Sequence, residues 1–191
     1  MIDIQANLQA LTSGDDRRAE AAVKALARAG KAAFPAVHEL LASPVADTRW
    51  WATWALASFD LPEVPALLHG ILKDPDLSVR QCAALALRVQ PTPEAIPDLI
   101  ELLSEQDSVL VRLAGAALTA VGKQAVPALL DLVREGSQKA RLEAVRTLAM
   151  IGDERAIATL FEVSQEDSAV IEYWANEGLE RLGIGMVFFN P

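Results

Sequence analysis

The chain has 191 residues, of which 52% are hydrophobic and only 5% aromatic, and its formal net charge at pH 7 is −9. This size and composition suit one or two domains with an aliphatic core, and runs of alternating β-branched residues are almost absent, so we predict an all-α protein. The negative charge argues against bulk affinity for nucleic acid or anionic membranes, and the single cysteine excludes an internal disulfide.

The N-terminus predicts no targeting segment. The first residues, Met1-Ile2-Asp3-Ile4-Gln5, contain neither a basic segment nor an apolar one of the kind found in signal peptides. No apolar stretch approaches the roughly 20 residues of a membrane span. These features, with the lone cysteine, predict a cytoplasmic protein that binds no membrane.

A leucine recurs along the chain every 30 or 31 residues, and an alanine stands four residues before each copy. The leucines are Leu26, Leu56, Leu87, Leu118, Leu148 and Leu179, and the alanines are Ala22, Ala52, Ala83, Ala114, Ala144 and Ala175. Residues that favour the end of a helix follow four positions later, most often glycine. About nine residues after each of the first four leucines, a proline opens a further apolar segment, which suits the first turn of a helix. These prolines are Pro35, Pro65, Pro97 and Pro127.

Each unit of about 31 residues therefore contains a first helix (the A helix), a short turn and a second helix (the B helix). Six such units must stack to bury their apolar faces, which makes an α-solenoid. We predict one domain over residues 1–183, with repeats at 1–30, 31–60, 61–91, 92–122, 123–152 and 153–183. The B helices are expected at 15–29, 47–59, 77–90, 108–121, 137–151 and 168–182. Residues able to cap an N-terminus stand near their starts: Ser13, Asp47, Asp76, Ser108, Ser137 and Ser168.

The units resemble HEAT repeats, specifically the short HEAT-like repeats of phycobilisome lyases. The resemblance rests on Asp74-Pro75-Asp76-Leu77-Ser78-Val79-Arg80 with Ala83-Ala84 and Ala86-Leu87, on Leu148-Ala149-Met150-Ile151-Gly152-Asp153-Glu154-Arg155-Ala156-Ile157, and on Val111-Arg112 with Ala116-Ala117-Leu118 and Val121-Gly122. It covers roughly residues 3–183 and implies a right-handed superhelix whose B helices line the concave side. Proteins of this kind are scaffolds, adaptors, lyase subunits and, in divergent cases, DNA glycosylases.

The resemblance also implies a ladder of arginines that brace the turns. The best-matched members are Arg49, Arg80 and Arg141, each seven residues before a repeat leucine. At about 100° per residue, that spacing turns the arginines toward the interior. Repeats one, four and six depart from the pattern.

The same helical arithmetic separates the core from an outer stripe on the B helices. The position two before each leucine lies about 160° from it and should face solvent, and the position six before lies on the adjoining flank. In repeat two these positions hold Trp54 and Trp50, one turn apart. With nearby side chains of the same stripe they form our predicted partner-binding set: Trp50, Trp54, Gln81, Leu85, Arg88, Arg112, Leu142, Arg146 and Tyr173.

Two interpretations of the tryptophan pair remain open. Exposed apolar clusters often indicate interaction sites, which favours a binding role for Trp50 and Trp54. Alternatively, the preceding turn or an A helix covers them and they belong partly to the core. Trp51 and Trp174, five residues before their leucines, are expected to be structural.

The charges are unevenly distributed. The expected B helices together carry +4 and the rest of the chain −13. A mildly basic B-helix side, around Arg88, Arg112, Lys139 and Arg146, would suit a protein segment with apolar anchors and acidic residues. If several of these cations are engaged within the chain, the surface is less basic than this count.

Candidates for catalysis or metal binding are sparse, so we predict no cofactor and no catalytic residues. His38-Glu39 is similar to the His-Glu pairs of the HEAT-repeat deoxyhypusine hydroxylases, but the second histidine stands in His69-Gly70, and a metal needs three or four ligands. Cys82 stands beside Ala83 and Ala84 on an expected B helix and is expected to fill core space. We expect a non-catalytic scaffold or adaptor that binds another protein, with two alternatives: a bilin lyase or its subunit, and a nucleic-acid binder or DNA glycosylase. The apolar tail 184–191 is expected to cap the last repeat or to mediate dimerisation.

Overall fold

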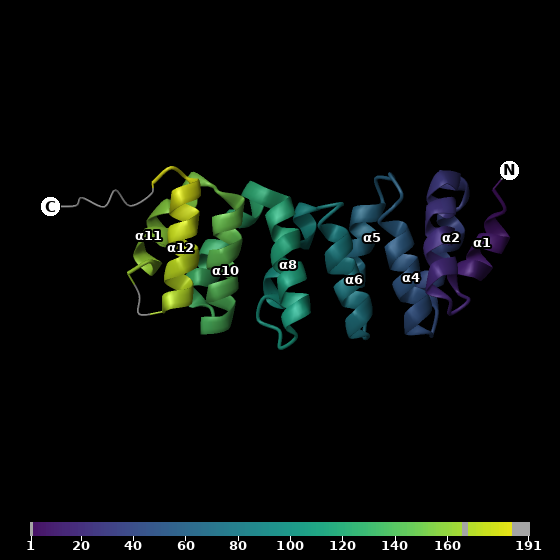
Figure 1. The fold of residues 1–191 in the computed structure, drawn as a ribbon, viewed down its shortest axis with the longest axis horizontal. Coiled ribbons are helices and arrows are strands. Elements are labelled where there is room, and N and C mark those ends of the chain that lie inside the picture. The colour runs from purple at the N-terminus through teal and green to yellow at the C-terminus, as the bar shows by residue number, and fades with distance from the viewer. Residues whose placement is uncertain (1, 166–167, 185–191) are drawn as a thin grey trace. The chain divides into compact units, whose positions relative to one another are not determined.

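The computed structural model describes residues 2–165 and 168–184. Within these residues the secondary structure is helical throughout, without strands (Figure 1). The A helices are α1 (Ile4–Leu11), α3 (Phe34–Glu39), α5 (Val64–Ile71), α7 (Ile96–Leu102), α9 (Val126–Glu135) and α11 (Ile157–Val163). The B helices are α2 (Asp16–Ala29), α4 (Ala46–Leu56), α6 (Leu77–Leu87), α8 (Ser108–Val121), α10 (Gln138–Ile151) and α12 (Ala169–Arg181).

The chain forms two compact units, residues 1–94 and residues 95–191. In unit 1, α4 packs between α2 and α6; in unit 2, α10 packs between α8 and α12 (Figure 1). The single domain and the repeat boundaries expected from sequence stay a prediction.

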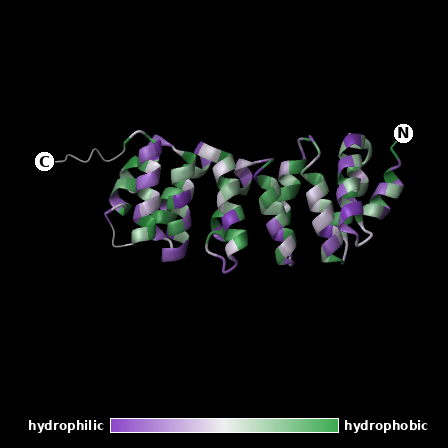
Figure 2. Cartoon of the chain, viewed as in Figure 1, coloured by the Kyte–Doolittle hydropathy of each residue, from purple (hydrophilic) through white to green (hydrophobic). Residues whose placement is uncertain are grey.

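The repeat leucines and alanines form the core of each unit. All six leucines are between 0% and 4% exposed, and all six alanines are between 0% and 1%. Green, white and purple segments alternate along the same helices, so each helix carries both hydrophobic and hydrophilic residues (Figure 2). The periodicity therefore identified the buried face of each B helix correctly.

Most helix boundaries follow the predicted signals. Each of the four repeat prolines stands in the first turn of its A helix. Gly30, Gly122, Gly152 and Gly183 end their helices with positive φ, a conformation that glycine adopts without the steric penalty of a Cβ atom. Asp76, Ser137 and Ser168 occupy the predicted cap positions.

Three predicted caps are wrong by one or two residues. The capping residue of α2 is Asp15 rather than Ser13, and that of α8 is Asp107 rather than Ser108, because the carboxylates accept the backbone N–H bonds of Arg18 and Leu110. The N-cap position of α4 is Val45, which offers no side-chain acceptor, and Asp47 lies inside the first turn instead.

The three predicted arginines brace turns, as expected. Arg49 donates two hydrogen bonds of 2.8 Å to the Asp74 carboxylate and one of 3.0 Å to the Ser43 carbonyl. Arg80 Nη1 donates to the Asp74 carbonyl at 3.1 Å, and Arg141 Nε donates to the Val133 carbonyl at 2.8 Å. The bonds from Arg49 lower the pKa of the Asp74 carboxyl.

A fourth arginine brace, absent from the predictions, lies in unit 2. Arg155 bonds Asp153 through its Nε at 2.8 Å and its backbone N–H at 3.0 Å, and Arg155 Nη2 donates to the Lys123 carbonyl at 2.6 Å. The Asp153 side chain is only 6% exposed. The side-chain and backbone bonds from Arg155 hold the pKa of Asp153 at about 2, against an ordinary value of 3.8.

This depressed pKa gives an expected pH dependence of stability. A carboxyl whose pKa is lower in the folded state stabilises the protein above its unfolded pKa, and that contribution is lost as pH falls toward the folded pKa. Asp153→Asn is therefore expected to lower the melting temperature at pH 7 and to flatten its decline between pH 4 and pH 2. Thermal melts followed by circular dichroism at a series of pH values measure both effects. The matched control is Asp131→Asn, which removes an exposed ion pair with Arg134; equal pH profiles for the two variants would contradict the assignment.

The expectation that no apolar stretch approaches the length of a membrane span is wrong for Ser108–Glu135, which is long and apolar enough to cross a membrane by length and composition alone. In the structure it is divided at Gly122, where φ is 75°, into α8 and α9. Both helices pack against α10 as repeat helices do. Buried core helices also reach this length and apolar composition, so the stretch is weak evidence for a membrane span.

The C-terminal end of α12 closes with two backbone bonds, from Gly183 to the Glu180 carbonyl and from Ile184 to the Leu179 carbonyl, each 2.9 Å long. The tail expected to cap the last repeat lies, apart from Ile184, outside the described residues.

Candidate functional site

Three tryptophans gather on α4, and they differ in exposure. Trp51 is 7% exposed, which confirms its predicted structural role. Trp50 and Trp54 are half-buried. Their rings stack with centroids 6.1 Å apart and planes 20° apart, and the Trp50 ring meets Trp51 edge to face at 4.9 Å. Both rings are thus packed against a neighbouring ring and remain partly accessible, and their role in binding stays a prediction.

The accessible sides of these rings line a pocket of about 640 Å³ in unit 1. Its walls come from the first two turns of three neighbouring B helices and from the tryptophans. The lining residues are Asp16, Arg17 and Glu20 of α2, Asp47, Trp50, Trp51 and Trp54 of α4, and Ser78 of α6. Three carboxylates thus face one guanidinium, so the lining is acidic where the charge of the B helices predicted a basic surface.

The polar part of this pocket escaped the sequence analysis, although a signal for it existed. Asp16, Asp47 and Ser78 follow one another at intervals of 31 residues, the period of the repeat itself. Positions separated by one full repeat lie side by side on stacked helices. Extending the repeat comparison to the first turn of the B helices would have placed these three residues together.

The other predicted site residues of unit 1 lie outside this pocket. Gln81 and Leu85 are half-buried on α6, and Arg88 is exposed immediately after that helix. Gln81 is engaged in an interaction within the chain. Their role in binding stays a prediction.

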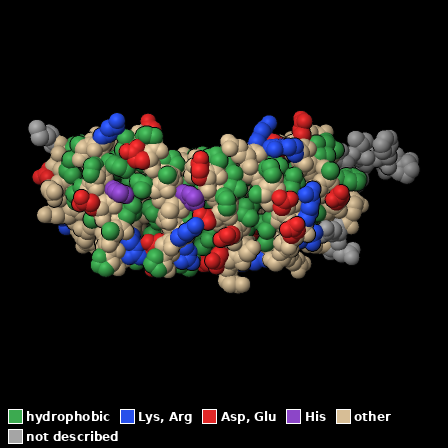
Figure 3. Space-filling view, turned by 180° about the vertical axis from the view of Figure 1, so that it is seen from behind, with side chains coloured by type: hydrophobic (Ala, Val, Ile, Leu, Met, Phe, Trp, Pro, Cys, Tyr) green, Lys and Arg blue, Asp and Glu red, His purple; other side chains and the backbone are tan. Residues whose placement is uncertain are grey.

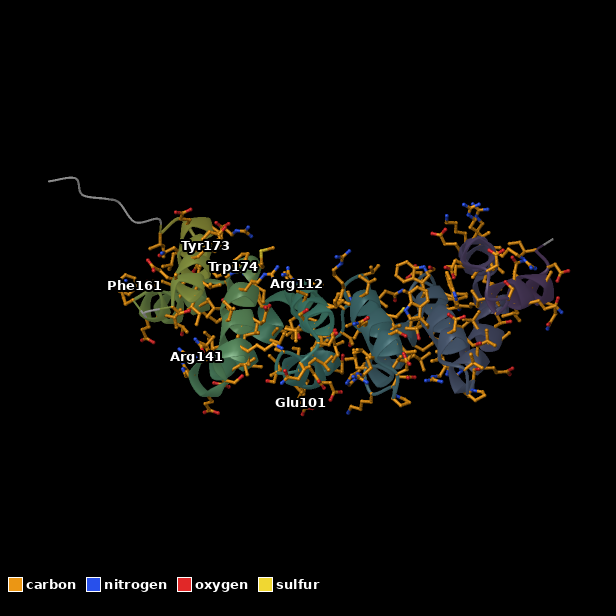
Figure 4. All side chains as sticks on the ribbon, turned by 60° about the horizontal axis from the view of Figure 1, so that its bottom comes forward. Glu101, Arg112, Arg141, Phe161, Tyr173 and Trp174 are labelled. Atoms are coloured by element: carbon orange, nitrogen blue, oxygen red, sulfur yellow. The ribbon has the colours of Figure 1, made fainter. Side chains whose placement is uncertain are left out.

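Two of the predicted residues of unit 2, Arg146 and Tyr173, contact Trp174 on α12. The Arg146 guanidinium carbon lies 5.0 Å from the centre of the Trp174 ring, and Arg146 Nη1 lies 3.6 Å from a Glu143 carboxylate oxygen. Tyr173 is 59% exposed and meets Trp174 edge to face. Arg112 is exposed, and Figure 4 shows it on the same side of unit 2 as Tyr173 and Trp174, whereas Arg141 and Glu101 lie on the other side. Leu142 is half-buried on α10.

Two of the cations expected to make the B-helix side basic are engaged within the chain. Arg146 is held between Trp174 and Glu143, as described above. Lys139 Nζ donates to the backbone carbonyls of Glu105 and Gln106, and so braces the turn before α8. The surface is therefore less basic than the count of charges indicated.

Cys82 lies beneath the tryptophans and is not an activated nucleophile. It is 2% exposed, and its Sγ lies 3.7 Å from the Trp50 carbonyl oxygen. Burial raises the pKa of the thiol to about 12, so the reactive thiolate is almost absent near neutral pH. Its predicted role as a core residue is confirmed.

The histidine pair makes no metal site in the described part of the chain. His38 lies on α3 and His69 on α5, and the two imidazoles appear as separate groups on the face shown in Figure 3. Within residues 2–165 and 168–184, no group of three or more His, Cys, Asp or Glu side chains could hold a metal ion.

Comparison with known proteins identifies the family. The model of HEAT repeats matches residues 4–88, 62–119 and 96–180. A phycocyanobilin lyase subunit beta of Nostoc sp. strain PCC 7120 is 34% identical over 105 residues, which are 54% of this chain and 52% of that protein. A protein of the same name from Pseudanabaena tenuis is 41% identical over 76 residues, or 40% of this chain and 27% of that protein. The bilin biosynthesis protein RpcF of Synechococcus sp. strain WH8020 is 36% identical over 94 residues, which are 49% of this chain and 45% of that protein.

The chain thus spans about half, or less, of the length of these curated relatives. Solved structures show the same fold at low identity. A designed armadillo repeat protein, solved with a (KR)4 peptide, has a TM-score of 0.57 at 20% identity and covers 94% of this chain and 99% of that one. The complex of CpcE and CpcF of the Nostoc phycocyanin lyase has a TM-score of 0.54 at 20% identity. The match covers 96% of this chain and 78% of that one. The helical repeats, the family model and the solved structures together show an α-solenoid, and the chain belongs to the HEAT-repeat family.

Proposed function

We propose that this chain is a non-catalytic, protein-binding subunit of the bilin-lyase type, which holds a segment of another polypeptide at the tryptophan-lined pocket of unit 1. The observation that carries the proposal is the half-exposed, stacked pair Trp50 and Trp54 at the wall of a pocket of about 640 Å³. Support for the lyase setting comes from the relatives, which are named lyase subunits and a bilin biosynthesis protein.

The two indoles pack against neighbouring rings. Each ring is fixed on one side by its neighbours, so binding a partner orders little that is not already ordered, and the entropic penalty is small. An indole offers a large apolar surface to a partner, and tryptophans are among the most frequent hot-spot residues of protein interfaces. A pocket with rigid aromatic walls and a polar rim has the anatomy of such a site.

Photo-cross-linking tests whether a polypeptide binds there. Benzoylphenylalanine replaces Trp54 in the full chain, and the partner cross-linked in an extract of the source organism is identified by mass spectrometry and then purified. The control position is Phe161 on α11, an aromatic residue that is 58% exposed in unit 2. We expect one polypeptide to be captured from position 54 and not from position 161, and to bind the purified protein. Capture of the same set from both positions, or of nothing from position 54, would refute the proposal.

A second candidate, binding of an open-chain tetrapyrrole in the same pocket, is favoured by the names of the relatives and by the polar lining. Arg17 offers a guanidinium to a propionate, and Asp16, Glu20 and Asp47 offer acceptors for pyrrole N–H groups. On mixing with phycocyanobilin, we expect coelution of pigment and protein in gel filtration with a shifted visible absorbance, both lost in Trp54→Ala. Elution of free pigment from the intact protein would exclude this candidate. The three carboxylates repel phosphate, so we do not propose nucleic-acid binding here.

A further inference from the structure

The pocket of unit 1 is acidic, and its carboxylates are not neutralised by ion pairs. Asp16, Glu20 and Asp47 face a single cation of the lining, Arg17. Among the residues that the structure describes, none of the three carboxylates forms a salt bridge. The lining therefore holds an excess of negative charge beside the tryptophans.

The helix N-termini around the pocket do not cancel this charge. A helix N-terminus carries roughly half a positive charge, which would favour an anionic guest. Here Asp15 caps α2 and Asp76 caps α6, so carboxylates outside the lining already occupy two of the three N-termini. The N-terminus of α4 has no side-chain cap, and Asp47 stands in its first turn. At each of these helices a carboxylate in the cap or the first turn thus offsets the partial positive charge of the helix end.

The tryptophans add a second preference for a cation. The faces of indole rings are electron-rich and attract cations, more strongly than the rings of tyrosine or phenylalanine. The Trp50 and Trp54 planes differ by only 20°, so their faces are nearly parallel, and the Trp51 ring stands at 82° to Trp50. A planar guanidinium stacks on such a face while its N–H groups bond neighbouring carboxylates.

The chain itself contains a model of this contact in unit 2. There the Arg146 guanidinium lies 5.0 Å from the Trp174 ring centre and 3.6 Å from the Glu143 carboxylate. Within the described residues, no cation of the chain lies over Trp50 or Trp54. The indoles of α4 and their carboxylates thus present the same combination with the cation missing.

We propose that the anchor of the partner at this pocket is an arginine side chain, which stacks on Trp50 or Trp54 and pairs with Glu20 and Asp47. This inference rests on the proposed function and reverses the charge expected of the partner from the sequence: the segment that binds unit 1 is basic rather than acidic.

A short synthetic peptide tests the inference in the full-length protein. The probe is acetyl-Gly-Arg-Gly-Arg-Gly-amide, and its matched controls carry citrulline, which is the neutral isostere of arginine, or glutamate in place of arginine. Binding is measured from the indole N–H resonances of the protein, which are assigned with single tryptophan variants. We expect the arginine peptide to shift the signals of Trp50 and Trp54, and to bind about tenfold or more tightly than the citrulline peptide, because a charged guanidinium adds both ion pairing and cation–π attraction. Equal binding of the arginine and citrulline peptides, or preference for the glutamate peptide, would overturn the inference.

Charge-neutralising variants localise the effect. Glu20→Gln with Asp47→Asn is expected to weaken binding of the arginine peptide about tenfold or more, because it removes two of the carboxylates. The control pair is Glu172→Gln with Glu180→Gln, which makes an equal change of charge on the exposed face of α12, and it should leave binding unchanged. Equal losses in both double variants would overturn the inference.

The two proposals fail separately. If the cross-linked partner depends on Trp54 but is insensitive to Glu20→Gln with Asp47→Asn, the arginine inference fails and the proposed function stands. If position 54 captures no partner, the proposed function fails whatever the peptide does.

Discussion

Replacing Trp50 and Trp54 together with alanine is expected to weaken binding of the partner by on the order of a hundredfold or more. Hot-spot residues at protein interfaces contribute about 2 kcal/mol or more each on truncation, and the two rings form one stacked pair. Titration calorimetry with the purified partner, identified by cross-linking, measures the loss. The matched control is Phe161→Ala, which removes an exposed aromatic ring in unit 2 and should leave the affinity unchanged.

The half-burial of both rings adds an expected effect on stability. The Trp50 ring packs against Trp51, so its removal also weakens contacts within unit 1. A loss of about 1 kcal/mol in the free energy of unfolding lowers the melting temperature of a protein of this size by roughly 2–4 °C. We expect the double variant to lose a few times this amount of stability and to retain its helicity. If the double variant unfolds, Trp54→Leu alone keeps the test decisive because it preserves an apolar side chain. Undiminished affinity in a folded variant would show that the partner binds elsewhere.

Gly178→Ala is expected to destabilise the protein by about 1–3 kcal/mol, although alanine is normally the better helix former. Gly178 lies where α12 packs against α10 and α11. A Cβ atom there would stand 2.9 Å from the Ala149 Cβ, 2.9 Å from the Leu160 Cδ1 and 3.0 Å from the Ala149 Cα. Two of these atoms belong to the body of α10 and not to the end of a flexible chain, so the helices must separate to accommodate the methyl group.

The control for this substitution is another helical glycine. Gly70 on α5 is exposed, and nothing lies within 4 Å of a Cβ built there. Gly70→Ala should raise the free energy of unfolding by roughly 0.5–1 kcal/mol, because alanine loses less backbone entropy on folding. Urea denaturation measures both changes, and a stabilising effect of Gly178→Ala would show that the α10–α12 spacing adjusts freely.

The repeat pattern predicted the fold well because it depends on few and strong local rules. Leucine and alanine four residues apart share one helix face, proline suits the first turn of a helix, and glycine suits a left-handed stop. The structure confirms these for the six leucines, the four repeat prolines and the four repeat glycines. The caps were less certain, because an aspartate and a serine often stand side by side and only the backbone geometry selects between them, as at Asp107 and Ser108.

The candidate site was predicted only in part, because the repeat pattern does not show how neighbouring helices are placed around a side chain. The angular positions of Trp50 and Trp54 on their helix indicated that the side chains point outward. They could not show how much of each ring is covered by neighbouring helices. The charge was summed over the whole length of the B helices, so charged residues at the two ends of each helix were counted together. The acidic residues of α2 and α4 that line the pocket lie in the first two turns of those helices, whereas Lys139 and Arg146 are engaged within unit 2. A count by helix therefore predicted the wrong sign at the place where the tryptophans lie.

The placement of the tryptophans also has a spectroscopic consequence. Three of the four stand on α4 in unit 1, and only Trp174 belongs to unit 2. Intrinsic fluorescence therefore reports mainly on the unfolding of unit 1, whereas far-ultraviolet circular dichroism reports on the helices of both units. Repeat proteins can unfold progressively, because each repeat contacts only its neighbours. Coincident transitions by the two probes would show that both units unfold as one cooperative body, and separate transitions would allow the stability of each unit to be measured within the intact chain.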